Sequence, residues 1–134
     1  MTEASVSKKG LWAGRILSGL LALFLLLDGG MKVAKPAFVV EATMRLGFSE
    51  SAIVPIGLVL IICTILYLIP VTAVLGAILL TGYLGGAVAT HVRVGEELFP
   101  IFFASTFGVL LWLGLFLQDT RLRTLIPLRS NNRS

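Results

Sequence analysis

The chain has 134 residues, of which 57% are hydrophobic and only 13% are charged, and its net charge is +4. Soluble domains carry about a quarter charged residues, and a small water-soluble fold leaves too much surface exposed to hide so many apolar side chains. The composition therefore excludes an ordinary soluble domain and indicates a protein of the lipid bilayer. The basic residues form no stripe interleaved with aromatic residues, which argues against a nucleic-acid partner.

Four apolar runs are long enough to cross a bilayer. A spanning helix needs about 20 mostly apolar residues, and its backbone groups must be satisfied within the segment. The runs do not alternate between polar and apolar residues, so a transmembrane barrel is not indicated. We predict an all-α membrane protein, a four-transmembrane-helix antiparallel bundle. It forms a single transmembrane domain over 1–134, with helices at about 11–33, 53–68, 71–90 and 98–117 and a basic cytoplasmic tail over 118–134.

The first apolar run follows a polar start that ends in Lys8 and Lys9, as in the n-region of a signal peptide. The run is longer than a signal-peptide core, and Asp28 to Lys32 after it contain no small-x-small cleavage pattern. We therefore expect an uncleaved first helix.

The longest connection, 32–52, is predicted to contain a short interfacial helix. Pro36 is suited to its first turn and Gly47 to its end. Glu41 and Arg45 are spaced i,i+4 with the acid first, which favours a helical ion pair. The apolar residues Phe38, Val39, Ala42 and Leu46 supply a membrane-facing side. A plain solvated loop is the alternative interpretation.

Basic residues mark the orientation of the bundle, because cytoplasmic flanks carry an excess of Lys and Arg. More of them flank the termini than lie in the two outer connections. We predict a multi-pass protein of the cell membrane (inner or plasma membrane) with N- and C-termini cytoplasmic. The residues at the termini are Lys8, Lys9, Arg15, Arg121, Arg123, Arg129 and Arg133, and those outside are Lys32, Lys35, Arg45 and Arg93.

Small residues recur at four-residue spacing in several runs, and close approach of helices in lipid relies on such residues. The third run carries two adjacent small faces and is predicted to be the centre of packing. Alternatively, the segment from Gly82 to Gly86 clears room for a flat ligand beside the backbone. The predicted packing residues are Gly14, Ser18, Ala77, Thr81, Gly82, Gly85 and Gly86.

Charged residues of both signs gather at the outer ends of the runs. Orientation explains the basic inner side but not this mixture, which indicates either a hydrated interface or a polar lid over an intramembrane pocket. His91, the only histidine, could exchange a proton with a bound quinone or substrate. We expect Asp28 or Lys32 to bond to the segment 90–96, beside a cavity between the first and third helices. The ligand-binding candidates are Asp28, Lys32, Glu41, Arg45, His91, Arg93 and Glu96.

Cysteine and histidine counts limit the chemistry. Cys63 is the only cysteine, so the chain alone cannot carry out thiol–disulfide exchange. No Cys/His ligand set for a metal exists, and a haem with two histidine ligands from one chain is excluded. We expect no metal site, and no catalytic residue is assigned.

The stretch 69–93, with Thr81-Gly82-Tyr83-Leu84-Gly85-Gly86 at its centre, resembles the DoxX-like family. The pattern Asp28-Gly29-Gly30-Met31-Lys32 after Phe24 and the long outer first connection are also similar. The resemblance covers roughly residues 10–117. It implies a four-helix bundle and an association with membrane redox chemistry, because the family takes its name from a quinone-linked thiosulfate-oxidising system. It supplies no catalytic residue set.

The favoured function is a redox- or quinone-linked accessory subunit of a membrane oxidoreductase system, rather than an autonomous enzyme. The alternative is a non-catalytic membrane scaffold or assembly protein, or a small-molecule-binding membrane protein. A small transporter is disfavoured, since small four-helix exporters tend to place an acid deep in the first helix, whereas 20–27 is entirely apolar. The lipid bilayer is the expected partner, and a membrane-associated oxidoreductase and a second copy of the chain are candidates. The cofactor is unassigned, with a quinone as the candidate.

Overall fold

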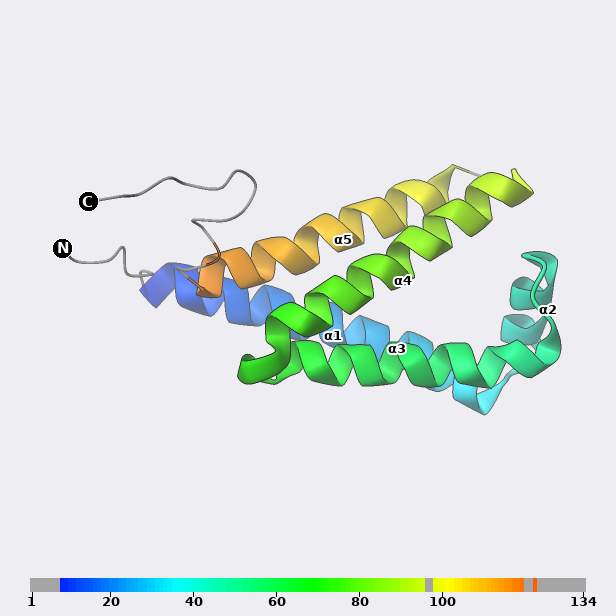
Figure 1. Ribbon diagram of the computed structural model, residues 1–134, viewed down its shortest axis with the longest axis horizontal. Helices are drawn as coiled ribbons and strands as arrows, with labels where there is room; N and C mark the ends of the chain where they lie inside the picture. Colours follow the sequence, from blue (N-terminus) through cyan, green and yellow to red (C-terminus); the bar gives the residue numbers. More distant parts are fainter. Residues whose placement is uncertain (1–7, 96–97, 120–121, 123–134) are drawn as a thin grey trace.

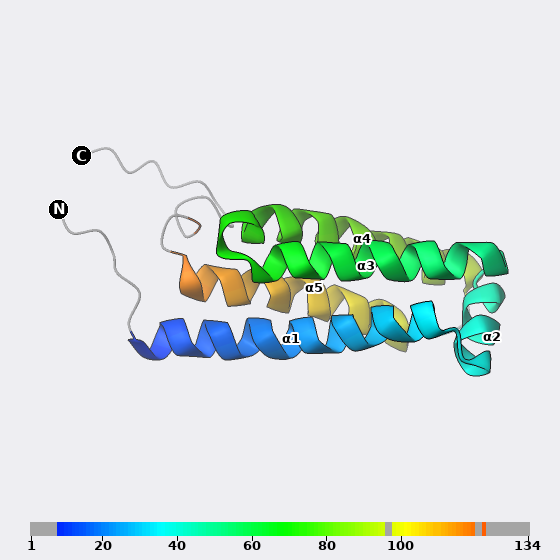
Figure 2. The same cartoon turned by 90° about the horizontal axis from the view of Figure 1, so that it is seen from below.

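The computed structural model describes residues 8–95, 98–119 and 122, and within these residues every regular element is helical. Four long helices run up and down, each antiparallel to its neighbours, and a short helix lies across one end (Figures 1 and 2). The long helices are α1 (Lys8–Ala34), α3 (Ile53–Leu68), α4 (Ala73–Val94) and α5 (Phe99–Gln118). The short helix is α2 (Ala37–Arg45), and the 3-10 turns η1 (Glu50–Ala52) and η2 (Pro70–Thr72) lead into α3 and α4.

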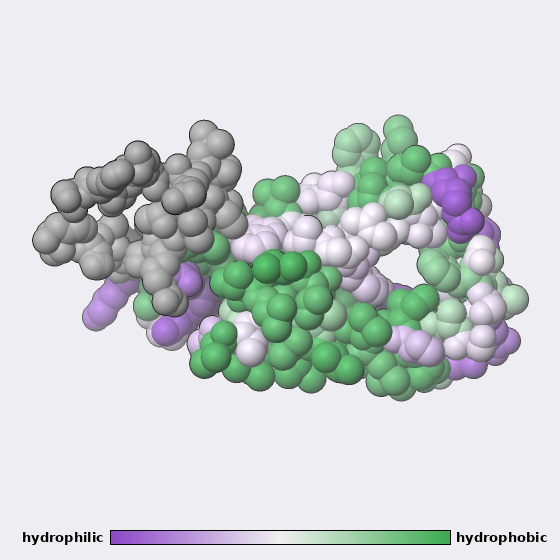
Figure 3. Space-filling model, in the orientation of Figure 1, coloured by the Kyte–Doolittle hydropathy of each residue, from purple (hydrophilic) through white to green (hydrophobic). Residues whose placement is uncertain are grey.

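The four long helices are apolar and long enough to cross a membrane, over Lys8–Ala34, Glu50–Leu68, Pro70–Val94 and Phe99–Gln118. Large apolar side chains such as Leu20, Ile62 and Val109 are exposed on their outer faces. Figure 3 shows hydrophobic residues covering the side of the bundle and hydrophilic residues gathered near its ends. Water would not tolerate so much exposed apolar surface, whereas lipid does. The prediction of an all-α membrane protein with a short helix in the first connection is confirmed.

The helices form a ring in which α1 packs against α3 and α5, and α4 packs against the same two helices from the opposite corner. Glycines form the closest crossings. A Cβ added at Gly57 of α3 would lie 2.8 Å from the carbonyl oxygen of Gly29 in α1. A Cβ added at Gly14 of α1 would lie 2.8 Å from the carbonyl oxygen of Gly114 in α5. The backbone of α1 therefore lies directly against both of its neighbours.

The row of small residues on α4 does not form the centre of packing, in contrast to the prediction. A Cβ added at Gly82, Gly85 or Gly86 would meet no atom within 4 Å, so none of these residues packs against a neighbouring helix. Ala77 is fully buried, and Thr81 accepts a 2.7 Å hydrogen bond from the indole of Trp112 in α5. Four-residue spacing identifies a helix face but not the neighbour that the face meets.

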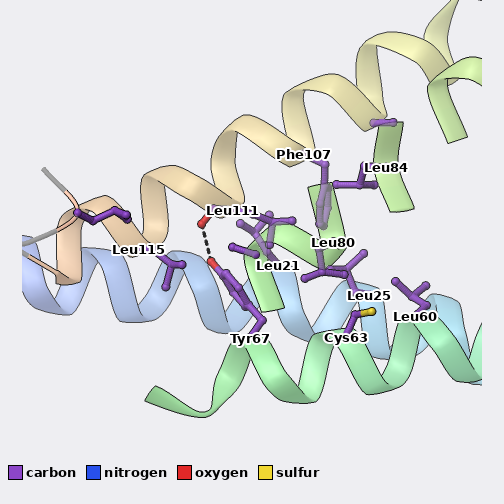
Figure 4. Close-up of a cluster of buried hydrophobic side chains, with 13 residues drawn as sticks. Leu21, Leu25, Leu60, Cys63, Tyr67, Leu80, Leu84, Phe107, Leu111 and Leu115 are labelled. Atoms are coloured by element: carbon purple, nitrogen blue, oxygen red, sulfur yellow. Dashed lines mark hydrogen bonds between the residues drawn. The ribbon is translucent and has the colours of Figure 1, made fainter. Parts of the chain in front are cut away.

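Leucines fill the middle of the bundle (Figure 4). Leu60 of α3, Leu80 of α4 and Leu111 of α5 are fully buried, and Leu21 and Leu25 of α1 complete the layer. Each helix thus contributes to one apolar core, whose packing in lipid depends mainly on van der Waals contact.

A chain of hydrogen bonds links three helices next to this core. The Tyr67 hydroxyl of α3 donates to the carbonyl oxygen of Leu111 at 2.6 Å (Figure 4). It has one hydrogen, so the bond of 2.8 Å to Ser18 of α1 must be donated by the serine. Gln118 of α5 donates its amide to the Ser18 oxygen at 3.0 Å and to the carbonyl of Gly114 at 2.9 Å. The chain runs from Gln118 through Ser18 and Tyr67 to Leu111.

The helix bounds differ from the predicted ones chiefly at the ends of α1 and α4. Helix α1 begins at Lys8 rather than Leu11, and α4 continues to Val94 rather than ending at Thr90. Gly95 ends α4 with a φ of 75° and donates its N–H to the carbonyl of His91, as is common after a helix. The predicted tail over 118–134 lies outside the described residues, apart from 118, 119 and 122.

Candidate functional site

A cavity of about 840 Å³ occupies the end of the bundle that α2 crosses. Helices α4 and α5 diverge from α1 and α3 toward this end (Figure 1), and the surface is hollowed there in Figure 3. Residues of α1, α4 and α5 line the cavity, with residues of α2 over its outer end and one residue of α3, Ile56. It is large enough for a small organic ligand.

Phenylalanines from α1 and α5 form an aromatic wall, which consists of Phe24, Phe99, Phe103 and Phe107. The ring centroid of Phe24 lies 5.5 Å from that of Phe103 and 5.2 Å from that of Phe107, and the planes are tilted by about 45°. Such separations are typical of favourable aromatic pairs. Tyr83 of α4 also lines the cavity. The wall offers a broad apolar surface on which a flat ring can lie.

An ion pair on α1 contributes the charges nearest to this wall. The Lys32 ammonium lies 2.7 Å from the Asp28 carboxylate, one helical turn away, and both residues line the cavity. The Lys32 side chain is 17% exposed and that of Asp28 40%, so the pair is partly shielded from solvent. Each charge neutralises the other, and the pair adds no net charge to the cavity.

Three polar groups of α4 line the cavity. The His91 Nδ1 lies 2.8 Å from the carbonyl of Ala87, so the neutral ring donates from Nδ1 and Nε2 carries the lone pair. The Thr90 hydroxyl donates to the carbonyl of Gly86 at 2.8 Å. Among the described residues, the Tyr83 hydroxyl has no hydrogen-bond partner. His91 Nε2 and the Tyr83 hydroxyl are therefore available to a ligand.

Helix α2 is held over the cavity by contacts at its two ends. The Arg93 guanidinium of α4 donates to the carbonyl of Leu46 at 2.9 Å, at the C-terminal end of α2, where a cation is favoured. Gly47 leaves room for it, since a Cβ there would lie 2.8 Å from Arg93 Nη2. Before α2, Lys35 pairs with Glu50 of η1 at 3.3 Å.

The predicted ligand-binding residues have different positions in the structure. Asp28, Lys32 and His91 line the cavity. Glu41 and Arg45 are exposed on α2 and form no ion pair with each other. Arg93 binds the α2 backbone and does not line the cavity. Glu96 lies outside the described residues.

The predicted bond from Asp28 or Lys32 to the third span is absent from the described part of that segment, 90–95. Asp28 and Lys32 satisfy each other on one face of α1 instead. The aromatic wall and Tyr83 were missed as site residues. The i,i+4 spacing of Phe99, Phe103 and Phe107 was the available signal, because it places three rings on one face of a helix.

The fold and this cavity define an integral membrane protein, a bundle of four spanning helices with a partly polar intramembrane cavity at one end. A model of the DoxX-like family matches residues 16–114 of the chain. The protein belongs to the DoxX-like family. No curated protein and no solved structure matches the chain.

Proposed function

We propose that this protein binds a neutral amphipathic molecule with a flat ring, of the quinone type, and serves a membrane oxidoreductase system as an accessory subunit. The cavity of about 840 Å³ beneath α2 carries this proposal. It combines an aromatic wall with a few polar groups, which is the usual composition of a site for a small organic ligand.

The shape and polarity of the cavity favour a ring with an apolar tail. Phe103 and Phe107 provide a surface for stacking, and such contacts add to the burial of apolar area. The cavity opens among lipid-facing helices, so a tail can remain in the bilayer. A hydrophobic ligand would reach this site through the membrane rather than through water.

The polar groups favour a neutral head group with oxygen atoms. The Tyr83 hydroxyl can donate to a carbonyl oxygen, and His91 Nε2 can accept a proton from a hydroxyl of the reduced form. Asp28 and Lys32 already neutralise each other. A ligand with a net charge would find no unpaired counter-charge among these groups, and an unpaired charge at membrane depth is costly.

The accessory role follows from the chemistry available to the chain. Its only thiol, Cys63, is buried in the core, and one thiol cannot give up two electrons by forming a disulfide within the chain. We therefore assign ligand binding to this protein and the supply of electrons to a partner oxidoreductase in the same membrane.

Binding is tested by titrating a short-chain ubiquinone into the purified protein in nanodiscs and following heat release by calorimetry. Saturable binding is expected. Tyr83→Phe should weaken binding about tenfold, which is the usual effect on affinity of losing one hydrogen bond to a ligand. Ala87→Phe should abolish binding, because the larger side chain fills the cavity. Gly85→Leu is the matched control, because it adds a side chain to the open face of the same helix. Equal affinity in all three variants, or no saturable binding, would favour a scaffold.

We also propose that both termini are cytoplasmic and that α2 lies on the outer side of the cell membrane. The excess of basic residues at the termini supports this orientation. Phosphatase reporters fused after Asp119 should be inactive, whereas insertion at Ser49 to Ser51 should give periplasmic activity. The reverse pattern would place the ligand cavity on the cytoplasmic side.

A further inference from the structure

Arg15 is a charged residue about two turns inside the first membrane span, counted from Lys8. Its guanidinium carbon lies 5.6 Å from the centroid of the Trp12 ring. Among the described residues it has no carboxylate or carbonyl partner, whereas Asp28 and Lys32 pair with each other. The side chain is exposed, and a guanidinium near the headgroup level is stabilised by an anion, which no described residue supplies to Arg15.

A second cavity, of about 260 Å³, opens beside this guanidinium at the end of the bundle opposite to α2. All four long helices line it, and among the described residues of its lining Arg15 is the only charged one. The other described polar groups of the cavity have no free hydrogen. Ser18, Tyr67 and Gln118 already donate theirs within the hydrogen-bond chain that runs from Gln118 to Leu111. The guanidinium is therefore the free donor. A Cβ added at Gly19 would meet no atom within 4 Å, so the cavity is open there.

We infer that this second cavity binds the phosphate group of an anionic membrane lipid through Arg15. The guanidinium lies over the Trp12 ring, which leaves its N–H edge for two parallel hydrogen bonds to phosphate oxygens. A long arginine side chain two turns into a span reaches the headgroup level. Leu68 and Pro70 in the cavity wall suit the apolar part of the lipid. This inference is independent of the proposed function, because the ligand cavity lies at the other end.

Two variants test the site in different ways. Arg15→Gln removes the charge, and Gly19→Leu fills the open side of the cavity while the charge remains. Gly82→Leu is the matched control, because it places the same side chain at an equally open position of α4 that does not line either cavity. Gly19→Leu also keeps the test decisive if Arg15→Gln does not fold.

The experiment compares thermal unfolding in nanodiscs of phosphatidylcholine with and without phosphatidylglycerol, and counts retained lipids by native mass spectrometry. Phosphatidylglycerol should stabilise the wild type and Gly82→Leu, and both site variants should bind it about tenfold more weakly or worse. Wild-type retention in both site variants, or loss of binding in Gly82→Leu as well, would overturn the inference. Equal stabilisation by inorganic phosphate would overturn the lipid assignment and leave a free-anion site.

Discussion

Leucine in place of Gly57 is expected to lower the free energy of unfolding by about 3 kcal/mol, near the top of the usual range for overpacking. Even a Cβ at this position would lie 2.7 Å from the Cβ of Lys32 and 2.8 Å from the carbonyl oxygen of Gly29. Both atoms are fixed to the backbone of α1 and cannot rotate away. Helices α1 and α3 would have to separate, and their closest contact would be lost.

Gly85→Leu is the matched control for this prediction. A Cβ at Gly85 would meet no atom within 4 Å, so the same leucine should change the stability by no more than about 0.5 kcal/mol. Thermal unfolding of both variants in detergent, followed by circular dichroism, measures the difference. A loss for Gly85→Leu as large as that for Gly57→Leu would contradict the arrangement of α4 and restore the packing role predicted from its small residues.

Tyr67→Phe is expected to cost about 1–3 kcal/mol, because it leaves a buried polar group without its partner. The Tyr67 hydroxyl is the only described acceptor for the Ser18 hydroxyl hydrogen, and it also donates to Leu111. Tyr67 is 2% exposed, so water cannot easily replace the lost bonds. In lipid, helix–helix hydrogen bonds of this kind are among the specific contacts between spans.

Tyr83→Phe provides the comparison for this tyrosine. The Tyr83 hydroxyl has no partner among the described residues, so its removal should leave the stability within about 0.5 kcal/mol of the wild type. Chemical unfolding of the two variants side by side would measure the contrast. Tyr67→Phe should lose stability and keep its affinity for the ligand. Tyr83→Phe should keep its stability and lose affinity for the ligand. If both variants lost stability equally, the assignment of Tyr83 to a ligand site would be wrong.

The spanning helices were predictable from sequence because the bilayer admits few structures. A long apolar run in lipid must satisfy its own backbone groups, so length and composition alone determine a helix. The helix contacts were not predictable in the same way. Gly29 and Gly57 bring the backbones of α1 and α3 into contact, yet neither belongs to a conspicuous row of small residues. Gly82, Gly85 and Gly86 of α4 meet no neighbouring helix. Spacing along one helix contains no information about its neighbours.

The candidate site was predictable in position but not in composition. Charged residues at the outer ends of the runs indicated a polar end, and Asp28, Lys32 and His91 do line a cavity there. Arg93 instead binds a backbone carbonyl, because the fold of α2 brings Leu46 to it. The link between Ser18 and Gln118 was also beyond prediction, since the two residues are 100 positions apart in the sequence.

The leucine core has an electrical consequence for the two cavities. Leu21, Leu80 and Leu111 lie between them, and the hydrogen-bond chain on the core's edge ends at a backbone carbonyl, which cannot take up and pass on a proton. Any membrane voltage therefore falls mainly across this apolar layer, where the dielectric constant is low. Proton exchange at His91 with the water on its own side would move little charge through that field. Ligand protonation in this cavity would thus be nearly insensitive to the membrane potential.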